Sequence, residues 1–222
     1  MCTSTRALAK LCLPLALLLA AALAVLALDP DLDLAAARAF YAGHAHFIGQ
    51  TPAGTVVRYT AWAIPFLVYV GCLVSWLVAK ARRSPGPSGR ALLFLTLSLA
   101  IGPGLLVHAG LKELSHRPRP YDITAFGGRE TFRPFTRFDG ACPHNCAFAS
   151  GETAATTWML APASLVPPPW RGLALAAAVA FAATTGLLRM AFGAHFLSDV
   201  CGGALVTLLV VLALRATLLR HH

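Results

Sequence analysis

Charged residues are scarce in this sequence, and their scarcity excludes an ordinary soluble domain. Only 12% of the 222 residues are Asp, Glu, Lys or Arg, about half the usual share in soluble proteins, and 57% are apolar. The apolar residues also come in blocks that are too long for the core helices of a soluble fold. The composition therefore predicts one integral membrane domain that occupies residues 1–222.

The sequence also lacks the patterns of a nucleic-acid-binding protein and of a metal site. The formal charge is +9, but no basic stripe is interleaved with aromatic residues. Cys142 and Cys146 lie four positions apart in a polar loop, and no second Cys or His pair has the spacing of zinc ligands. We expect no cofactor, no metal and no nucleic-acid partner. A disulfide between the two cysteines is our interpretation if the loop faces an oxidising compartment, and two free thiols are the alternative.

Six apolar runs approach the ~20 residues that a helix needs to cross a bilayer. They cover about 7–28, 59–79, 91–111, 148–166, 172–188 and 200–219, and the fourth is the weakest by hydropathy. The expected fold class is all-α, a bundle of six transmembrane helices. Arg6 and Lys10 precede the first run as in a signal peptide, but the run is long for one, so we expect it to be retained.

The basic residues of the short loops predict the orientation. They lie before the first run, between the second and third, between the fourth and fifth, and at the chain end. With six crossings these positions share one side, which is the cytoplasmic side by the positive-inside rule. Segments 29–58, 112–147 and 189–199 then face outward. The 112–147 loop is basic as well, and this exception is explained if its cations bind substrate.

A stripe of residues at helical spacing predicts an interfacial helix in the first outward loop. The stripe lies within 34–48, between Asp29-Pro30 and Pro52, and comprises Phe40, Tyr41, His44, Phe47 and Ile48. Such a helix would lie flat in the outer interface and help lipid reach a site there. A plain amphipathic packing helix remains the alternative.

Arg189, His195 and Asp199 form a polar cluster between the last two apolar runs. The guanidinium of Arg189 matches the oxygens of a phosphate, and His195 is a candidate nucleophile or base. Asp199 lies four residues after His195, on the same face if that turn is helical, where a carboxylate can fix the tautomer of the imidazole. A lone histidine here would be read as interfacial packing, but its two partners favour phosphoryl chemistry.

Two further clusters also adjoin apolar runs. Lys112 and Arg119, followed by Pro120, come after the third run, and Ser150-Gly151-Glu152 opens the fourth. Alone, the first pair would be ordinary membrane-flanking cations and Ser150 a simple helix N-cap. Together with the last cluster, they are interpreted as phosphate ligands, with the Gly151 backbone able to approach an oxygen closely.

These residues resemble the type 2 phosphatidic acid phosphatase superfamily, whose fold is shared with vanadium haloperoxidases. Its signature is K-x6-R-P, then P-S-G-H, then S-R-x5-H-x3-D. The first motif is matched by Lys112, Arg119 and Pro120, and the third from Arg189 to Asp199, with Leu188 where the family usually has Ser. The resemblance spans roughly 90–200.

The resemblance implies a six-helix membrane phosphatase that works without metal. It implies that His195 attacks phosphorus and forms a phosphohistidine, which water then hydrolyses, while Asp199 orients His195. It also implies a set of residues that hold the phosphate oxygens: Lys112, Arg119, Arg189, Ser150 and the backbone of Gly151. The enzyme would lie in a bacterial inner (plasma) membrane, with its site facing the periplasm or exterior.

The middle motif departs from the family pattern, because Ala149 replaces Pro and Glu152 replaces His. In the family that histidine is thought to protonate the leaving oxygen. A carboxyl group can do so only if it is protonated near neutral pH. Our hypothesis is that Glu152 is the general acid, with His144 and His116 as stand-in candidates. The alternatives are that the departure marks a subgroup or a weakly active protein.

The leading prediction is an outward-facing lipid phosphate phosphatase, acting on a phosphomonoester or diphosphate. Candidate substrates are phosphatidic acid, phosphatidylglycerol phosphate, polyprenyl phosphates or diphosphates, and the phosphates of lipid A. Three arginines of the 121–147 loop favour a multiply anionic substrate or else bind anionic headgroups nonspecifically: Arg129, Arg133 and Arg137. A phosphotransferase using the same intermediate and a catalytically silent lipid-binding protein are the alternatives. Nothing in the sequence indicates the oligomeric state.

Overall fold

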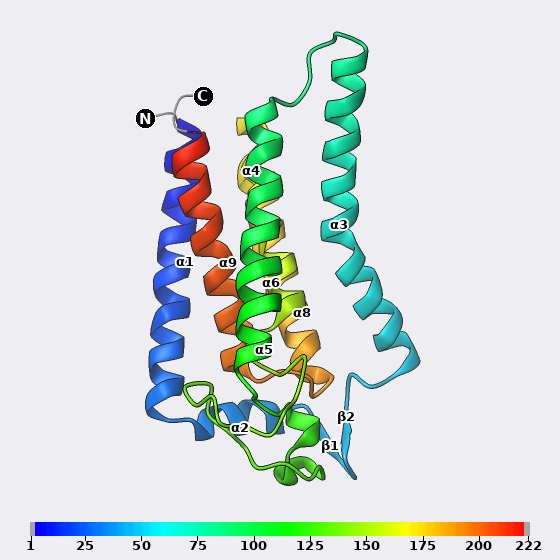
Figure 1. The fold of residues 1–222 in the computed structure, drawn as a ribbon, viewed down its shortest axis with the longest axis vertical. Coiled ribbons are helices and arrows are strands. Elements are labelled where there is room, and N and C mark those ends of the chain that lie inside the picture. Colours follow the sequence, from blue (N-terminus) through cyan, green and yellow to red (C-terminus); the bar gives the residue numbers. More distant parts are fainter. Residues whose placement is uncertain (1–2, 220–222) are drawn as a thin grey trace.

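The computed structural model describes residues 3–219 and is mostly helical (Figure 1). Its long helices are α1 (Thr3–Leu28), α3 (Pro52–Ala81), α8 (Pro168–Ala191) and α9 (Leu197–Leu218). A further rod is formed by α4 (Gly89–Leu99), the π-helix η1 (Ala100–Leu111) and α5 (Lys112–Leu114). These five rods stand side by side in a bundle (Figure 1).

All five rods are long and apolar enough to cross a membrane. The candidate spans are Leu11–Leu28, Pro52–Ala81, Gly89–Leu114, Pro168–Ala191 and Leu197–Leu218. Large apolar side chains such as Leu18, Leu67 and Leu173 point outward, each about two-thirds exposed. An apolar surface of this extent suits hydrocarbon rather than water. The chain is an integral membrane protein, as its composition predicted.

The fourth predicted helix, over 148–166, is not one long helix. It forms α6 (Gly151–Thr157) and α7 (Leu160–Ala163), separated by a turn, and it is not among the five candidate spans. The Thr156 hydroxyl bonds the carbonyls of Glu152 and Thr153, and Trp158 is fully buried with its indole N–H donating to Ser98 Oγ at 2.9 Å. Because protein rather than lipid surrounds this segment, it does not need the hydropathy of a lipid-facing helix.

The segment nevertheless runs the length of the bundle. At one end, Ser150, the N-cap residue of α6, donates its N–H to the carbonyl of Asp199. At that same end Arg189, near the close of α8, lies 3.4 Å from Glu152. Since α8 is a straight helix that reaches this end at its C-terminus, Pro168 must lie at the opposite end, and residues 150–167 connect the two.

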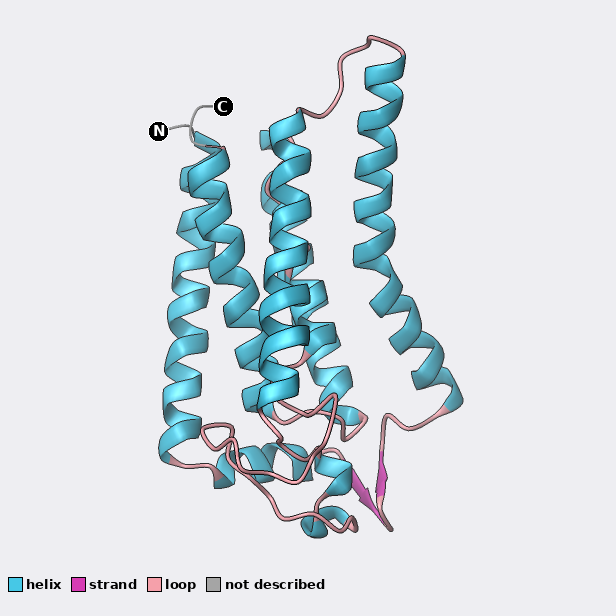
Figure 2. Ribbon diagram, viewed as in Figure 1, coloured by secondary structure: helices cyan, strands magenta, loops and turns pink. Residues whose placement is uncertain are grey.

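The predicted interfacial helix over 34–48 is wrong in its second half. Helix α2 (Asp31–Arg38) is shorter, and the chain then forms a hairpin of β1 (Tyr41–Gly43) and β2 (His46–Phe47), with Tyr41 opposite Phe47 (Figure 2). The turn is made by Gly43, His44 and Ala45, all at positive φ, a conformation that ends a helix. Tyr41 and Phe47 therefore face each other across the two strands, with ring centroids 5.3 Å apart.

An apolar cluster joins the hairpin to the long loop and to α9. Phe47, Phe126 and Phe196 are each at most 1% exposed, and Phe126 belongs to the 3₁₀-helix η3 (Thr124–Phe126) that follows η2 (Pro120–Asp122). The Phe47 and Phe126 rings meet edge to face at 5.4 Å. Loops that lie far apart in sequence thus form one fixed layer at this end of the bundle (Figure 2).

Candidate active site

The three polar clusters converge on one cavity at the loop end of the bundle. Its volume is about 520 Å³, and its lining includes Lys112 and Arg119 of the first cluster, Gly151 and Glu152 of the second, and Arg189 and His195 of the third. The other two residues predicted for the site, Ser150 and Asp199, are fully buried behind this lining. Residues more than 80 positions apart in sequence are thus brought together.

His195 lies in the turn between α8 and α9 and is 2% exposed. Its Nδ1 is 2.8 Å from the carbonyl oxygen of Ala147. Because a carbonyl only accepts hydrogen bonds, we infer that Nδ1 carries the proton and that Nε2 keeps a free lone pair. Burial, followed by the positive charges of Lys112 and Arg189, holds the pKa of His195 well below its ordinary value of 6.5. The ring is therefore neutral and nucleophilic.

Asp199 acts on His195 mainly through its charge. Its Oδ2 is 3.6 Å from His195 Nδ1, too long for a hydrogen bond, and instead accepts the backbone N–H of Phe196 at 2.7 Å. Its Oδ1 accepts a hydrogen bond from Arg117. The carbonyl of Ala147 therefore takes the bond that the sequence assigned to Asp199.

Lys112 and Arg119 are held by one residue of the long loop. The Lys112 ammonium donates to Asn145 Oδ1 at 3.0 Å and to the Cys146 carbonyl at 3.1 Å, and Arg119 Nη2 donates to the Asn145 carbonyl at 2.7 Å. Cys142 and Cys146 form a disulfide around this position. Sequence reasoning missed Asn145, although its place between two closely spaced cysteines was a usable signal.

Arg189 carries a donor that is free to bind an anion. It is 3% exposed, its Nη1 has no hydrogen-bond partner among the described residues, and its Nε lies 3.4 Å from Glu152 Oε2. Gly151 faces the same space, where a Cβ at this position would lie 3.3 Å from Cε of Lys112. Unmade hydrogen bonds in a buried guanidinium are costly, so the arrangement suits a phosphate that accepts them.

Ser150 is engaged elsewhere in the structure. Its hydroxyl is the N-cap of α6, 2.9 Å from Thr153 Oγ1 and accepting from the Thr153 N–H. It does not line the cavity. The structure thus gives Ser150 the capping role that its position also suggested.

Glu152 is paired with an arginine that sequence reasoning missed. Its Oε1 accepts from Arg58 Nη2 at 2.7 Å and from Arg58 Nε at 3.0 Å, and its Oε2 is 3.4 Å from Arg189 Nε. Arg58 comes from the first turns of α3, where a cation directly before an apolar run was the only available signal. This geometry makes Glu152 a hydrogen-bond acceptor that connects two guanidinium groups.

Neither stand-in histidine lines the cavity around His195, although His144 lines a second cavity beside it. His116 bonds the carbonyl of Cys142 at 3.0 Å, and the His144 side chain is 86% exposed near Glu113. A different histidine, His108 of η1, lines the cavity one helical turn from Lys112. π-Helical segments occur frequently at functional sites, and this one includes Gly102-Pro103-Gly104.

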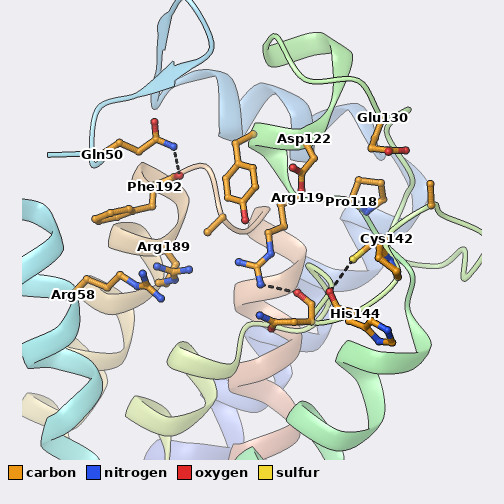
Figure 3. Close-up of a pocket in the computed structure, with 15 residues that line it drawn as sticks. Gln50, Arg58, Pro118, Arg119, Asp122, Glu130, Cys142, His144, Arg189 and Phe192 are labelled. Atoms are coloured by element: carbon orange, nitrogen blue, oxygen red, sulfur yellow. Dashed lines mark hydrogen bonds between the residues drawn. The ribbon is translucent and has the colours of Figure 1, made fainter.

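A second cavity of about 550 Å³ adjoins the first on the loop side. In Figure 3 the guanidinium groups of Arg58 and Arg189 lie next to each other and face Arg119 across it. Polar groups complete the lining, among them Gln50, Asp122 and Glu130, and burial raises the pKa of Asp122 above its ordinary value.

The three loop arginines expected to contact a headgroup line neither cavity. Arg137 pairs with Asp139, and Arg133 Nε lies 3.6 Å from the same carboxylate. The pKa of Asp139 is lowered, chiefly by its hydrogen bond from Arg137. The cations that do face the cavities are therefore those of the motifs and Arg58.

A sequence model of the PAP2 superfamily matches residues 91–221, more than half of the chain, and the chain belongs to that superfamily. It is an enzyme of the lipid phosphatase class. The motifs read from the sequence had indicated the same superfamily.

The chain is also similar to curated proteins over more than two thirds of its length. The chain is 34% identical over 166 residues to a lipid A 4′-phosphatase of Rhizobium leguminosarum, an alignment that covers 72% of this chain and 70% of the relative. It is 33% identical over 184 residues to a lipid A 4′-phosphatase of Francisella tularensis subsp. novicida, covering 78% and 81%. No solved structure matches the chain.

Proposed function

We propose that this enzyme removes a phosphate group from lipid A or a closely similar phosphorylated glycolipid, through a phosphohistidine and without a metal ion. One observation carries the proposal: His195, whose Nδ1 is bound to the Ala147 carbonyl, lines the cavity that also holds Lys112 and Arg189, and Arg189 Nη1 has no hydrogen-bond partner among the described residues. A nucleophile next to cations that can neutralise phosphate oxygens is what phosphoryl transfer requires.

The proposed reaction has two steps. His195 Nε2 attacks phosphorus in line with the lipid oxygen, the P–O bond breaks, and the departing oxygen takes a proton. Water then attacks the phosphohistidine, the P–N bond breaks, and inorganic phosphate leaves. Lys112, Arg119 and Arg189 stabilise the charge on the phosphate oxygens in both steps.

The two adjoining cavities support a lipid with a large polar headgroup. The cavity around His195 continues into an apolar region lined by Trp62, Phe66 and Leu99, which suits acyl chains. The cavity on the loop side is lined by amide and carboxyl groups, which suit sugar hydroxyls. Both named relatives act, by their names, on lipid A.

The proposed topology has six crossings, with residues 150–167 as the one enclosed within the bundle. The site then lies at the outer face of the inner membrane of a bacterium, because the basic loop 82–90 lies at the opposite, cytoplasmic end. The whole chain acts as one unit in this proposal, since α2 and α3 contribute to the site alongside the motif-bearing helices.

The leaving oxygen also needs a proton donor. Glu152 was the hypothesis from the sequence, but its Oε1 already accepts from Arg58 at 2.7 Å and its Oε2 lies 3.4 Å from Arg189 Nε. The observation favours His108 for this role, because it lies between the phosphate ligand Lys112 and the apolar region at Pro103 and Gly104. In the proposed complex, the oxygen that links phosphorus to the lipid would lie between these two regions, next to His108.

The test is phosphate release by detergent-purified protein in the presence of a chelator. The panel comprises lipid A, phosphatidic acid, phosphatidylglycerol phosphate and undecaprenyl diphosphate, with His195→Ala as the control. We expect release from lipid A at the highest kcat/KM, lost in the variant. Release from other lipids alone would refute the substrate, and transfer of the phosphate to an added acceptor lipid in place of release would identify a phosphotransferase.

A further inference from the structure

A fully buried arginine, Arg117, occupies a variable position of the first motif, between Lys112 and Arg119. Arg117 Nη1 donates to Ser198 Oγ at 2.7 Å and to Asp199 Oδ1 at 2.5 Å. Its Nη2 donates to Asp33 Oδ2 at 2.8 Å, and its Nε to the carbonyl of Arg133 at 2.8 Å. The plane of its guanidinium also faces the Phe196 ring at 4.3 Å. All three guanidinium nitrogens of Arg117 therefore donate hydrogen bonds, and these bonds fix the side chain in place.

Its second carboxylate comes from a distant part of the chain. Asp33 belongs to α2, is fully buried, and lies outside the segment matched by the superfamily. Its Oδ1 accepts the Ser198 N–H at 2.9 Å, and its Oδ2 accepts the Ser198 hydroxyl as well as Arg117. Every hydrogen bond of the Asp33 side chain among the described residues is thus one that its carboxylate accepts.

The charges of this cluster bear directly on His195. One guanidinium is shared by two carboxylates, so the buried cluster keeps one net negative charge. If Asp33 were neutral, Arg117 would cancel Asp199 completely. Because the cluster is buried, this difference of one unit charge has a strong electrostatic effect on the His195 ring, whose Nδ1 is 3.6 Å from Asp199 Oδ2.

We propose that Asp33 and Arg117 are positioning residues for catalysis: Arg117 fixes Asp199 beside His195, and Asp33 balances Arg117 so that Asp199 keeps its charge for the imidazole. This inference rests on the proposed phosphohistidine mechanism. When Nε2 bonds to phosphorus, the ring retains its Nδ1 proton and becomes cationic. When water later displaces the phosphate, the P–N bond breaks and the ring returns to neutrality. The negative cluster stabilises the cationic stage.

The decisive variant is Asp33→Asn, which keeps an acceptor for the Ser198 N–H and removes the charge. Rapid-quench measurement with a radiolabelled lipid phosphate would follow phosphoenzyme formation. We expect formation to slow by roughly 10- to 100-fold, a common range for residues that support a reactive group, with KM unchanged. The matched control is Asp31→Asn, an exposed aspartate on the same helix, which should form phosphoenzyme at the parent rate.

A charge-rescue variant separates this role from a merely structural one. Adding Arg117→Gln to Asp33→Asn removes both charges and returns the cluster to one net negative charge. We expect the double variant to form phosphoenzyme faster than Asp33→Asn alone, whereas a purely structural role predicts a slower or unfolded double variant.

The outcomes are distinguishable from failure of the proposed function. Absence of a phosphoenzyme in the parent protein would overturn the mechanism and this inference together. A parent phosphoenzyme that forms equally fast in Asp33→Asn would overturn the inference alone, as would a double variant slower than the single one. If Asp33→Asn does not fold, a folded double variant with a measurable phosphoenzyme still supports the charge balance, and an inactive one refutes it.

Discussion

Glu152 Oε1 accepts a hydrogen bond from Arg58 Nη2 at 2.7 Å, linking residues 94 positions apart. Arg58 stands on α3, the least buried of the candidate spans, with 11% of its most apolar window inside the protein. This ion pair therefore joins a peripheral helix, at the edge of the bundle in Figure 1, to the residues proposed to bind phosphate. Glu152, which replaces the usual family histidine, thus has Arg58 as its ion-pair partner.

Glu152→Gln should lower kcat/KM by roughly 10-fold or more, because Arg58 and Arg189 lose the carboxylate that holds them. The loss should be equal for a lipid phosphate and for an aryl phosphate with a good leaving group, measured side by side. Arg58→Met should cause the same loss, and the double variant should be no worse. A loss confined to the lipid substrate would instead make Glu152 the proton donor that the sequence suggested.

His108→Gln, by contrast, should cause a loss that depends on the leaving group. A general acid contributes roughly 10²- to 10⁴-fold when the leaving oxygen is a poor one, and little when it departs readily. We expect turnover of the lipid to fall by about 100-fold and turnover of an aryl phosphate to be nearly unchanged. His46→Gln, an exposed histidine on β2 that lines neither cavity, is the control. Equal losses on both substrates would exclude His108 as the donor.

The pH dependence follows from the lowered pKa of His195. The ring must be neutral to attack, and burial and nearby cations keep it neutral to lower pH than an ordinary histidine. The acid limb of kcat/KM should therefore lie below pH 6.5, with activity lost as the pH falls through the lowered pKa. An acid limb at or above pH 6.5 that disappears on replacing another histidine would contradict this assignment.

Reduction of the disulfide should weaken phosphate binding. The bridge encloses Asn145, which holds Lys112 and Arg119, so opening it frees the loop that positions both cations. The double variant Cys142→Ser, Cys146→Ser should raise KM by roughly 10-fold. A reducing agent should have the same effect on the parent and none on the double variant. Cys72→Ser, on α3, is the control that should leave KM unchanged.

Gly151→Ala tests the close approach of the backbone to the phosphate-binding lysine. The added Cβ would lie 3.3 Å from Lys112 Cε and would displace it by a few tenths of an ångström. Because small displacements in a site are costly, we expect a several-fold fall in kcat/KM with an unchanged thermal midpoint. A parent-like enzyme would show that Lys112 tolerates the shift.

Much of the site could be predicted because its residues lie at fixed spacing next to apolar runs. Lys112, Arg119, Arg189 and His195 converge on one cavity, as their motifs suggested. Arg58 and Asn145 could not be predicted in the same way, because each is a single residue whose partner lies far along the chain. Only the folded chain brings such pairs together.

The errors in the fold also have physical causes. The aromatic residues of 34–48 fit a helical stripe, yet the left-handed conformation at Gly43, His44 and Ala45 folds them into a hairpin. The run over 148–166 has the apolar character of a spanning helix but contains three buried threonines and breaks at Trp158. Composition alone does not distinguish a lipid-facing segment from one enclosed by its neighbours.

Two ion pairs connect α2 and α3 to the site, Asp33–Arg117 and Arg58–Glu152, and each has one member outside the segment matched by the superfamily. Asp33 and Arg58 both precede residue 91, where that segment begins. The segment matched by the superfamily therefore does not by itself contain both members of either pair. Chimaeras that exchange residues 29–88 between relatives would show whether this part tunes a shared catalytic unit.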